Sequence, residues 1–167
     1  MEFNDLEENR QRPNVERVSI EYMLKVIKNN NLKKVLEVGC FNGYSALMFS
    51  TAAESVKSIE IDKKNIEIAK ENFRKYKCEN IEILEGDAKN LLKILNEKFD
   101  LIFIDAIKNE YKEYLQSSLK LINKGFIYLD NTISHKEKMG DLFIYLQNSN
   151  LKWKELNIGR GLIEIKI

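Results

Sequence analysis

The sequence of 167 residues predicts a doubly wound α/β domain, in which a mostly parallel sheet carries helices on both faces. Strand-like and helix-like segments alternate along the chain, and right-handed β-α-β crossovers produce this pattern. Two short apolar runs, residues 99–105 and 126–131, stop at polar or acidic residues and suit strands buried on both faces. Two closing strand-like segments, joined by a short loop with glycines, predict a hairpin that adds an antiparallel strand.

Length and composition favour one domain with a substantial core. A chain of this size buries roughly 70% of its unfolded surface. Its 44% apolar and 32% charged residues are ordinary for a globular protein. Residues 1–13 lack clear periodicity and are predicted to form an N-terminal arm, whereas residues 14–167 are predicted to form the domain. The formal net charge of +1 gives no global basic field, so charge does not indicate RNA and does not exclude it.

Nothing in the sequence indicates a membrane or an oxidising compartment. No window approaches the length of about 18 apolar residues that a membrane span needs. The acidic start lacks the basic and apolar regions of a signal peptide. Cys40 and Cys78 are too few for a disulfide framework and are not spaced as zinc ligands. We therefore expect a cytoplasmic protein with two reduced thiols.

The spacing of apolar residues predicts each element up to residue 95. Helical spacing predicts helices over residues 18–27, 46–53, 63–76 and 91–95, the first of which fades into three asparagines. Short apolar or alternating segments predict strands over residues 34–38, 56–61 and 80–84.

The second half repeats the alternation. A strand over residues 99–105 precedes a helix whose apolar residues run from Tyr111 to Ile122, and Lys124-Gly125 is expected to stop that helix. A strand over residues 126–131 and a helix near residues 136–147 follow. Strands over residues 151–156 and 162–167 form the closing hairpin, which brings the predicted total to seven strands.

Oxygen ligands follow the two apolar runs of the second half. Asp105 ends the first run, and Asp130 and Asn131 end the second. If these strands are neighbours, about 4.8 Å apart, the three side chains converge at the carboxyl edge of the sheet. Oxygen ligands of this kind indicate a hard divalent cation such as Mg²⁺. Lys108, one helical turn beyond Asp105, is the candidate base.

The first half carries a pattern typical of nucleotide binding. Gly39 allows a ligand to approach the backbone, and Gly43 permits tight entry into a helix. The spacing is Glu-x-Gly-x-x-x-Gly, which differs from the Gly-x-Gly-x-x-Gly of dinucleotide sites. Glu60 lies 21 residues after Gly39, where an acid can bind both ribose hydroxyls, and Asp87 suits an adenine amino group. Three strand ends thus match the methionine, ribose and adenine parts of S-adenosylmethionine.

Taken together, these motifs resemble the metal-dependent class I O-methyltransferases of the catechol and caffeoyl-CoA type. The matching segments, in order, are Asn14-Val15, Gly43-Tyr44-Ser45-Ala46, Ile59-Glu60-Ile61, Gly86-Asp87-Ala88, Asp105-x-x-Lys108-x-x-Tyr111, Asp130-Asn131 and Ile158-Gly159-Arg160-Gly161-Leu162. The pairing of the Lys108 motif with Asp130-Asn131 is the specific part, because all class I methyltransferases share the glycine motif.

The resemblance implies a Rossmann-like class I methyltransferase fold with a seven-stranded sheet. It also implies the site residues. S-adenosylmethionine would contact Val15, Glu37, Gly39, Gly43, Tyr44, Ser45, Glu60, Ile61, Asp87, Ala88 and Asp105. Asp105, Asp130 and Asn131 would bind Mg²⁺ or another divalent cation, since Mn²⁺ and Ca²⁺ also accept oxygen ligands. Lys108 would act as the base for a hydroxyl of a small molecule with adjacent oxygens.

The chain departs from the family where the family selects its substrate. Few residues precede Asn14, the stretch between Asn131 and Gly159 is short, and Ile107 and Asn157 replace more typical residues. These differences predict an open site or one completed by a second subunit, as in a homodimer. Two alternatives follow: methylation of a hydroxylated nucleoside in transfer RNA, and a cofactor-binding protein without catalysis.

Several charged residues beyond Asn131 have two interpretations. His135, the only histidine, could touch substrate, although a solvated loop position is the simpler interpretation. Lys136 and Lys138, with Arg160, could form a small basic rim for a phosphate-bearing substrate. Charges at a solvated helix start explain the two lysines more simply.

Overall fold

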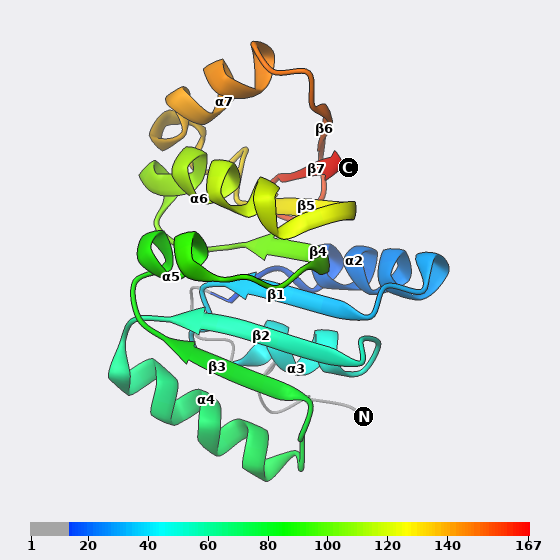
Figure 1. Cartoon of the computed structure of the whole chain (residues 1–167), viewed down its shortest axis with the longest axis vertical. Coiled ribbons are helices and arrows are strands. Elements are labelled where there is room, and N and C mark those ends of the chain that lie inside the picture. The colour runs from blue at the N-terminus through cyan, green and yellow to red at the C-terminus, as the bar shows by residue number, and fades with distance from the viewer. Residues whose placement is uncertain (1–13) are drawn as a thin grey trace.

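A computed structural model describes residues 14–167, so the predicted arm of residues 1–13 lies outside the described residues. Its seven strands form one sheet in the order β3-β2-β1-β4-β5-β7-β6 (Figure 1). β1 to β5 are parallel, and β7 is antiparallel to both of its neighbours, as predicted. The strands are β1 (Lys34–Val38), β2 (Ser55–Glu60), β3 (Ile81–Glu85), β4 (Phe99–Ile104), β5 (Ile122–Asp130), β6 (Lys152–Leu156) and β7 (Leu162–Lys166).

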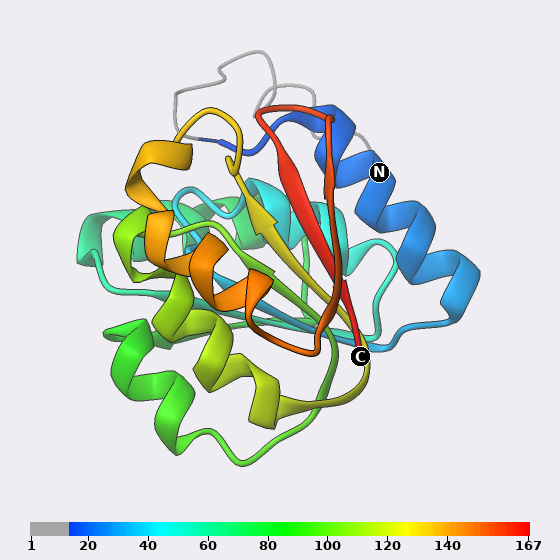
Figure 2. The ribbon, with the colours of Figure 1, turned by 90° about the horizontal axis from the view of Figure 1, so that it is seen from above.

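Helices cover both faces of the sheet, as predicted (Figure 2). One core lies between the sheet and the first three helices, and a second core lies between the sheet and the last three. The helices are α2 (Arg17–Asn30), α3 (Tyr44–Ser50), α4 (Lys63–Lys75), α5 (Ala88–Ile94), α6 (Tyr111–Ser118) and α7 (Gly140–Gln147). The central strands β1 and β4 are buried on both faces, and most of their residues are apolar.

Local sequence explains where several helices begin and end. The Asp62 side chain accepts hydrogen bonds from the backbone N–H groups of Lys64 and Asn65 and so caps α4. α2 ends at Asn31, whose φ of 53° is left-handed, a conformation that asparagine tolerates at a helix C-terminus. α3 begins at Tyr44, two residues before the predicted start. The helix predicted over residues 136–147 is divided into a 3₁₀ turn (Lys136–Lys138) and α7.

The prediction that Ile122 ends a helix is wrong. The α-helix ends at Ser118, a 3₁₀ turn covers Leu119–Leu121, and Ile122 already belongs to β5, where it pairs with Phe99. Gly125 is therefore a strand residue rather than a helix stop. Its φ is 147°, and a Cβ on it would lie 1.9 Å from the backbone oxygen of Asp100. The strand pairing shifts register beside it, so glycine is required for close approach of two backbones.

The sheet order places the predicted ligands at one edge. β4 and β5 are neighbours, and Ile104 pairs with Leu129. Asp105 and Asp130 follow these two residues directly, so both carboxylates lie at the carboxyl end of the parallel strands. Ligands of open α/β sheets bind at that end.

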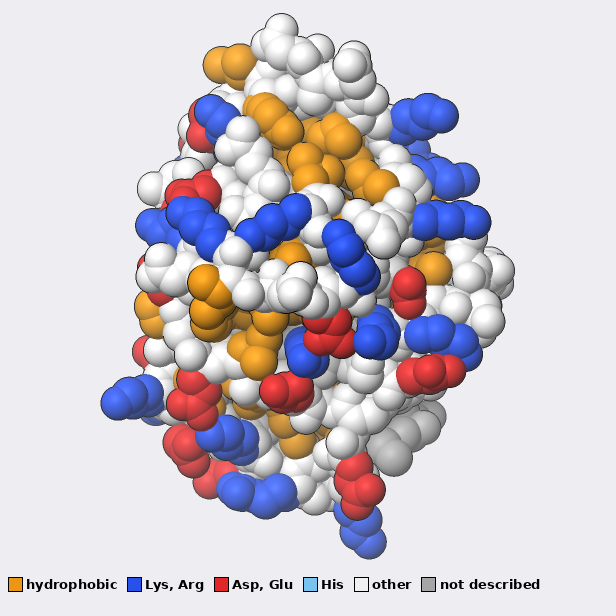
Figure 3. Space-filling view, viewed as in Figure 1, with side chains coloured by type: hydrophobic (Ala, Val, Ile, Leu, Met, Phe, Trp, Pro, Cys, Tyr) orange, Lys and Arg blue, Asp and Glu red, His pale blue; other side chains and the backbone are white. Residues whose placement is uncertain are grey.

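The surface is of mixed charge. Figure 3 shows Lys and Arg side chains interspersed with Asp and Glu over the face that it presents, which agrees with a formal net charge of +1. Within residues 14–167, no helix has the length and apolar character needed to cross a membrane.

Candidate active site

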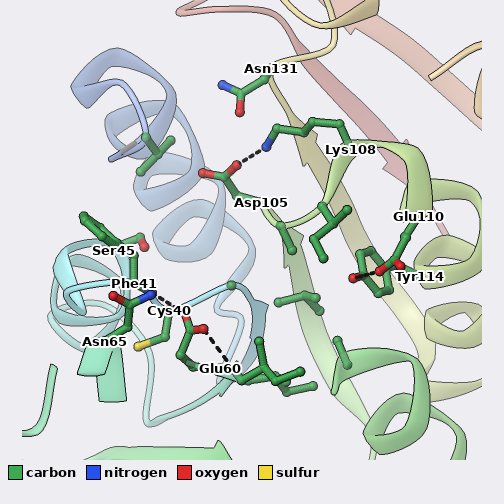
Figure 4. Close-up of a pocket in the computed structure, with 18 of the residues that line it drawn as sticks. Cys40, Phe41, Ser45, Glu60, Asn65, Asp105, Lys108, Glu110, Tyr114 and Asn131 are labelled. Atoms are coloured by element: carbon green, nitrogen blue, oxygen red, sulfur yellow. Dashed lines mark hydrogen bonds and ion pairs between the residues drawn. The ribbon is translucent and has the colours of Figure 1, made fainter. Parts of the chain in front are cut away.

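A pocket of about 430 Å³ opens at the carboxyl edge of the sheet. The turns that follow β1, β2, β3, β4 and β5 all contribute to its wall, together with the segment before α2 and the turn before β7. Figure 4 shows Ser45, Glu60, Asp105, Lys108 and Asn131 arranged around one space. Asn14 and Val15 line the pocket and are largely buried, at 9% and 3% exposure.

The turn after β1 brings two backbones together. Gly39 lines the pocket with a φ of 99°, and a Cβ on it would lie 2.2 Å from the backbone oxygen of Asp105. Gly43 has a φ of 81°, and its missing Cβ makes room for the Phe73 ring of α4. Neither Gly43 nor Tyr44 lines the pocket. Gly43 therefore serves the packing of α3 on α4, and cofactor contact by these two residues remains a prediction.

Glu37 is deeper than the glycine motif suggests. It is fully buried, accepts a hydrogen bond from the Ser58 hydroxyl and does not line the pocket. Burial raises the pKa of this carboxyl to about 8, and the nearby charges of Asp105 and Glu60 act in the same direction. Ser45, beside Glu37, does line the pocket at the start of α3.

Glu60 holds the turns of the predicted ribose end in place. One carboxylate oxygen accepts the Phe41 backbone N–H at 2.8 Å, and the other accepts those of Ile61 and Asp62 at 2.9 and 3.0 Å. The carboxylate lines the pocket, where its remaining lone pairs are available to a ligand. Ile61 also lines the pocket and is 63% exposed, an apolar side chain at the mouth.

Asp87 and Ala88 lie at the start of α5 and line the pocket. The Asp87 side chain accepts the Lys89 backbone N–H at 2.8 Å, so it caps the helix. A neighbouring network was not predicted: Tyr114 donates to Glu110, and Lys89 pairs with Glu110 at 2.6 Å. Only the spacing of Glu110 and Tyr114, four residues apart, could have suggested it from sequence.

Asp105, Lys108 and Asn131 line the opposite end of the pocket. The Lys108 ammonium donates to Asp105 Oδ1 at 2.5 Å and to the Tyr111 hydroxyl at 2.7 Å. Tyr111 is fully buried, and burial together with the charges of Asp105 and Asp130 raises its pKa well above the ordinary value. The tyrosine therefore stays neutral and anchors the lysine.

Asp130 is fully buried behind this end, and Asn131 donates its amide N–H to Asp130 Oδ2 at 3.0 Å. Burial and the charge of Asp105 raise the pKa of Asp130 to about 7. Asp130 Oδ1 is buried and has no hydrogen-bond partner among the described residues. An unpaired buried oxygen carries a desolvation penalty that a bound cation would offset.

The predicted donors thus fit a hard cation. They are two carboxylates and an amide, which is oxygen chemistry that Mg²⁺ accepts. Residues 14–167 contain no group of three His, Cys, Asp or Glu side chains arranged for a metal, so the amide of Asn131 is a necessary part of this set.

Two further residues line the same end, His135 and Arg160. Sequence reasoning favoured a solvated position for His135 and grouped Arg160 with two lysines. Arg160 lies between two glycines of the turn before β7. Its proximity to Asn131 could not be predicted, because no sequence spacing relates that turn to the end of β5.

Comparison with known proteins adds an independent finding. Residues 8–141 match the family model described as O-methyltransferase. O-methyltransferase ankF of Aspergillus thermomutatus is 38% identical over 110 residues, which cover 60% of this chain and 46% of ankF. A protein assigned as a cobalt-precorrin-6B C(15)-methyltransferase, from Saccharolobus solfataricus, is 32% identical over 77% of this chain and 68% of its own length. The chain thus spans about half the length of ankF.

Two solved structures share the fold. Podospora anserina methyltransferase PaMTH1, bound to SAH, has a TM-score of 0.88 and 24% identity, over 97% of this chain and 84% of that one. A Staphylococcus aureus protein, provisionally assigned as a caffeoyl-CoA O-methyltransferase, has a TM-score of 0.87 and 28% identity, over 98% and 90% of the two chains. These similarities confirm the predicted class I methyltransferase fold.

Proposed function

The chain belongs to the O-methyltransferase family, and on that premise we propose that it methylates a hydroxyl of a small molecule with adjacent oxygens. The methyl donor would be S-adenosylmethionine, and the reaction would depend on a divalent cation. The observation that carries the proposal is the convergence of Asp105, Asn131 and Lys108 on one pocket, with Asp130 directly behind it.

The cofactor would lie along the half of the pocket formed by the first three strands. Ser45 offers a hydroxyl at the start of α3, where the positive end of the helix dipole favours the carboxylate of the methionine part. Glu60 would accept hydrogen bonds from the ribose, and Asp87 with Ala88 would face the adenine. PaMTH1, which shares the fold, was solved with SAH bound. When bound, the cofactor supplies a methyl group on a sulfonium, which is already activated for displacement.

Asp105, Asp130 and Asn131 would hold the cation. When bound, it supplies a positive charge that lowers the pKa of a hydroxyl near it. The unpaired oxygen of buried Asp130 supports this assignment. The identity of the cation stays open, because the three donors are oxygens.

Lys108 would receive the proton of the acceptor hydroxyl at Nζ as the neutral amine, after the ammonium that pairs with Asp105 here has released its own proton. Its side chain is 15% exposed, and it is fixed between the Asp105 carboxylate and the buried Tyr111 hydroxyl. Both contacts hold the ammonium at the end of the pocket where the acceptor would lie. Because a fixed base needs no reorientation before it accepts a proton, the protein contributes mainly alignment.

The direct test is a calorimetric titration of S-adenosylmethionine and Mg²⁺ into wild type and Asp130→Asn, followed by a methyl-transfer screen with catechols. Asp141→Asn, at the exposed start of α7, is the matched control. We expect Asp130→Asn to lose Mg²⁺ binding and turnover while it retains cofactor binding. Wild type that binds cofactor but no divalent cation would exclude this mechanism and favour the non-catalytic alternative.

The same screen includes bulk transfer RNA. The surface of mixed charge does not favour a polyanion, so RNA remains the alternative substrate. A homodimer and a cytoplasmic location also remain predictions.

A further inference from the structure

Two cationic or hydrogen-bonding side chains face the proposed acceptor end of the pocket and have no role in the mechanism above. His135 and Arg160 line the pocket together with Asp105, Lys108 and Asn131. The guanidinium of Arg160 also lies near enough to Asp130 for its charge to act on that carboxylate. Arg160 acts on Asp130, and the backbone of His135 is hydrogen-bonded to Asn131, so both residues belong to the end of the pocket where the acceptor would lie.

The backbone holds the two residues in one unit. The N–H groups of Ile133 and Ser134 donate to the Arg160 carbonyl oxygen at 3.1 and 3.0 Å, and Thr132 donates to the Gly161 oxygen at 3.1 Å. His135 N–H donates to the Asn131 oxygen at 3.0 Å. The turn before β7 is thus hydrogen-bonded to the segment that carries the proposed metal ligand, so Arg160 and His135 have fixed positions relative to that ligand.

Each of these pocket-lining side chains keeps nitrogen atoms with no hydrogen-bond partner among the described residues. Arg160 uses Nε to contact Glu16 at 3.2 Å, and no other hydrogen bond of its guanidinium is found among the described residues. The Nη groups therefore remain for a ligand. The Ser134 hydroxyl contacts His135 Nδ1 at 2.9 Å, which leaves Nε2 to bond a ligand. Glu16 orients the guanidinium, and its own carboxylate adds one negative charge nearby.

The two lysines of the predicted basic rim do not belong to this group. Lys136 lies 3.5 Å from Glu155 and over the Phe143 ring at 4.7 Å, and neither Lys136 nor Lys138 lines the pocket. The positive side chains that reach the pocket are thus distinct from the exposed ones at the helix start. A guanidinium that lines a pocket matches a carboxylate or phosphate, because its fork of N–H groups binds two oxygens at once.

We propose that the acceptor carries an anionic group beyond its reacting hydroxyls, and that Arg160, assisted by His135, binds this group. The inference rests on the proposed function and narrows its substrate class to acidic diphenols and related molecules. Among the described residues, Asp105, Asp130 and Glu16 outnumber Lys108 and Arg160 at this end, but a divalent cation would reverse the sign of the local charge when bound. An anion is then favoured, because its oxygens would replace water on the Nη groups with charge-assisted hydrogen bonds.

The test compares two anionic acceptors with a neutral acceptor that matches the carboxylate in shape. We would measure kcat/KM for 3,4-dihydroxybenzoate, 3,4-dihydroxybenzylphosphonate and neutral 3,4-dihydroxybenzamide. Affinities for all three would be measured calorimetrically in the presence of S-adenosylhomocysteine and Mg²⁺. In wild type we expect roughly ten- to a hundredfold preference for an anionic acceptor over the amide. The better of the two anions identifies a carboxylate or a phosphate as the group recognised.

Variants test whether the Arg160 side chain causes the preference for an anionic acceptor. Arg160→Gln should bring the ratio of anionic to neutral acceptor close to one, and Arg160→Lys should retain part of it. Lys136→Gln, which removes a nearby charge outside the pocket, should leave the ratio unchanged. A wild-type ratio near one, or a preference for the anion that persists in Arg160→Gln, would overturn this inference. The proposed function would still stand in either case if wild type bound the cofactor and Mg²⁺. Failure of wild type to bind cofactor and Mg²⁺ would overturn both.

Discussion

The carboxyl of Glu37 should make the stability of this protein depend on pH in a way that one substitution removes. The side chain is fully buried in the central strand β1, and burial raises its pKa from 4.5 to about 8. The native state therefore holds a proton on Glu37 that the unfolded chain releases above its ordinary pKa. Because the folded pKa is the higher one, this contribution to stability is complete below about pH 4.5 and is lost as pH rises through 8.

The size of the effect follows from the shift. A rise from 4.5 to about 8 corresponds to at most about 5 kcal/mol, at about 1.4 kcal/mol for each pKa unit. Glu37→Gln keeps the shape of the protonated carboxyl and an oxygen for the Ser58 hydroxyl. The variant should match wild type near pH 5 and become more stable than wild type, by up to about 5 kcal/mol, near pH 8.5.

Urea unfolding between pH 5 and 9 at constant ionic strength, followed by the fluorescence of the single tryptophan, Trp153, measures this difference. Other titrating groups, including Asp130, occur in both proteins and cancel in the comparison. Glu82→Gln, at an exposed strand position, is the control and should run parallel to wild type. Parallel profiles for Glu37→Gln and wild type would refute the reasoning, because they would mean that Glu37 is ionised in the native state or hydrated.

Two other predictions test the turn after β1 and the base. Gly39→Ala should destabilise the fold by roughly 3 kcal/mol or more, because its Cβ would lie 2.2 Å from the Asp105 backbone oxygen at a φ of 99°. Gly140→Ala, where nothing lies within 4 Å of the added Cβ, should change stability by no more than about 1 kcal/mol; equal urea midpoints for the two variants would contradict this. Lys108→Met should lower kcat roughly 10²- to 10⁴-fold without weakening cofactor affinity, whereas Lys138→Met should leave kcat unchanged. A Lys108→Met enzyme with normal turnover would remove the lysine from the mechanism.

Most of the fold could be predicted because its signals are local. Strands buried on both faces are continuous apolar runs, and the amphipathic helices between them repeat with a different period, so all seven strands were found. The exception is the segment from Ile122 to Gly125. Its apolar residues continue the helical spacing of α6, and Lys-Gly is a common helix end. Pairing of Ile122 with Phe99 overrides that local preference, and pairing with a distant strand leaves no mark in the local pattern.

The residues at the carboxyl ends of strands were also within reach of the sequence. Asp105, Asn131 and Asp87 line the pocket just after the ends of parallel strands, and Glu60 lines it as the last residue of one. All parallel strands end at the same edge. How deeply a side chain is buried could not be predicted from the sequence. Glu37 is also an acid near the end of a parallel strand, yet it lies one residue before the end of β1, is fully buried and does not line the pocket.

The sequence by itself determined the α/β class, the seven strands and the family, because these depend on periodicity and on motifs that are continuous in the chain. Only the tertiary structure decided which side chains share the pocket. It brought Arg160 and His135 to the proposed acceptor end of the pocket. Lys136, which the sequence grouped with Arg160, pairs with Glu155 outside the pocket. That choice depends on hydrogen bonds between two turns about 25 residues apart in the sequence, such as Ser134 N–H to the Arg160 oxygen. Contacts of this kind arise only when the sheet has brought the turns together.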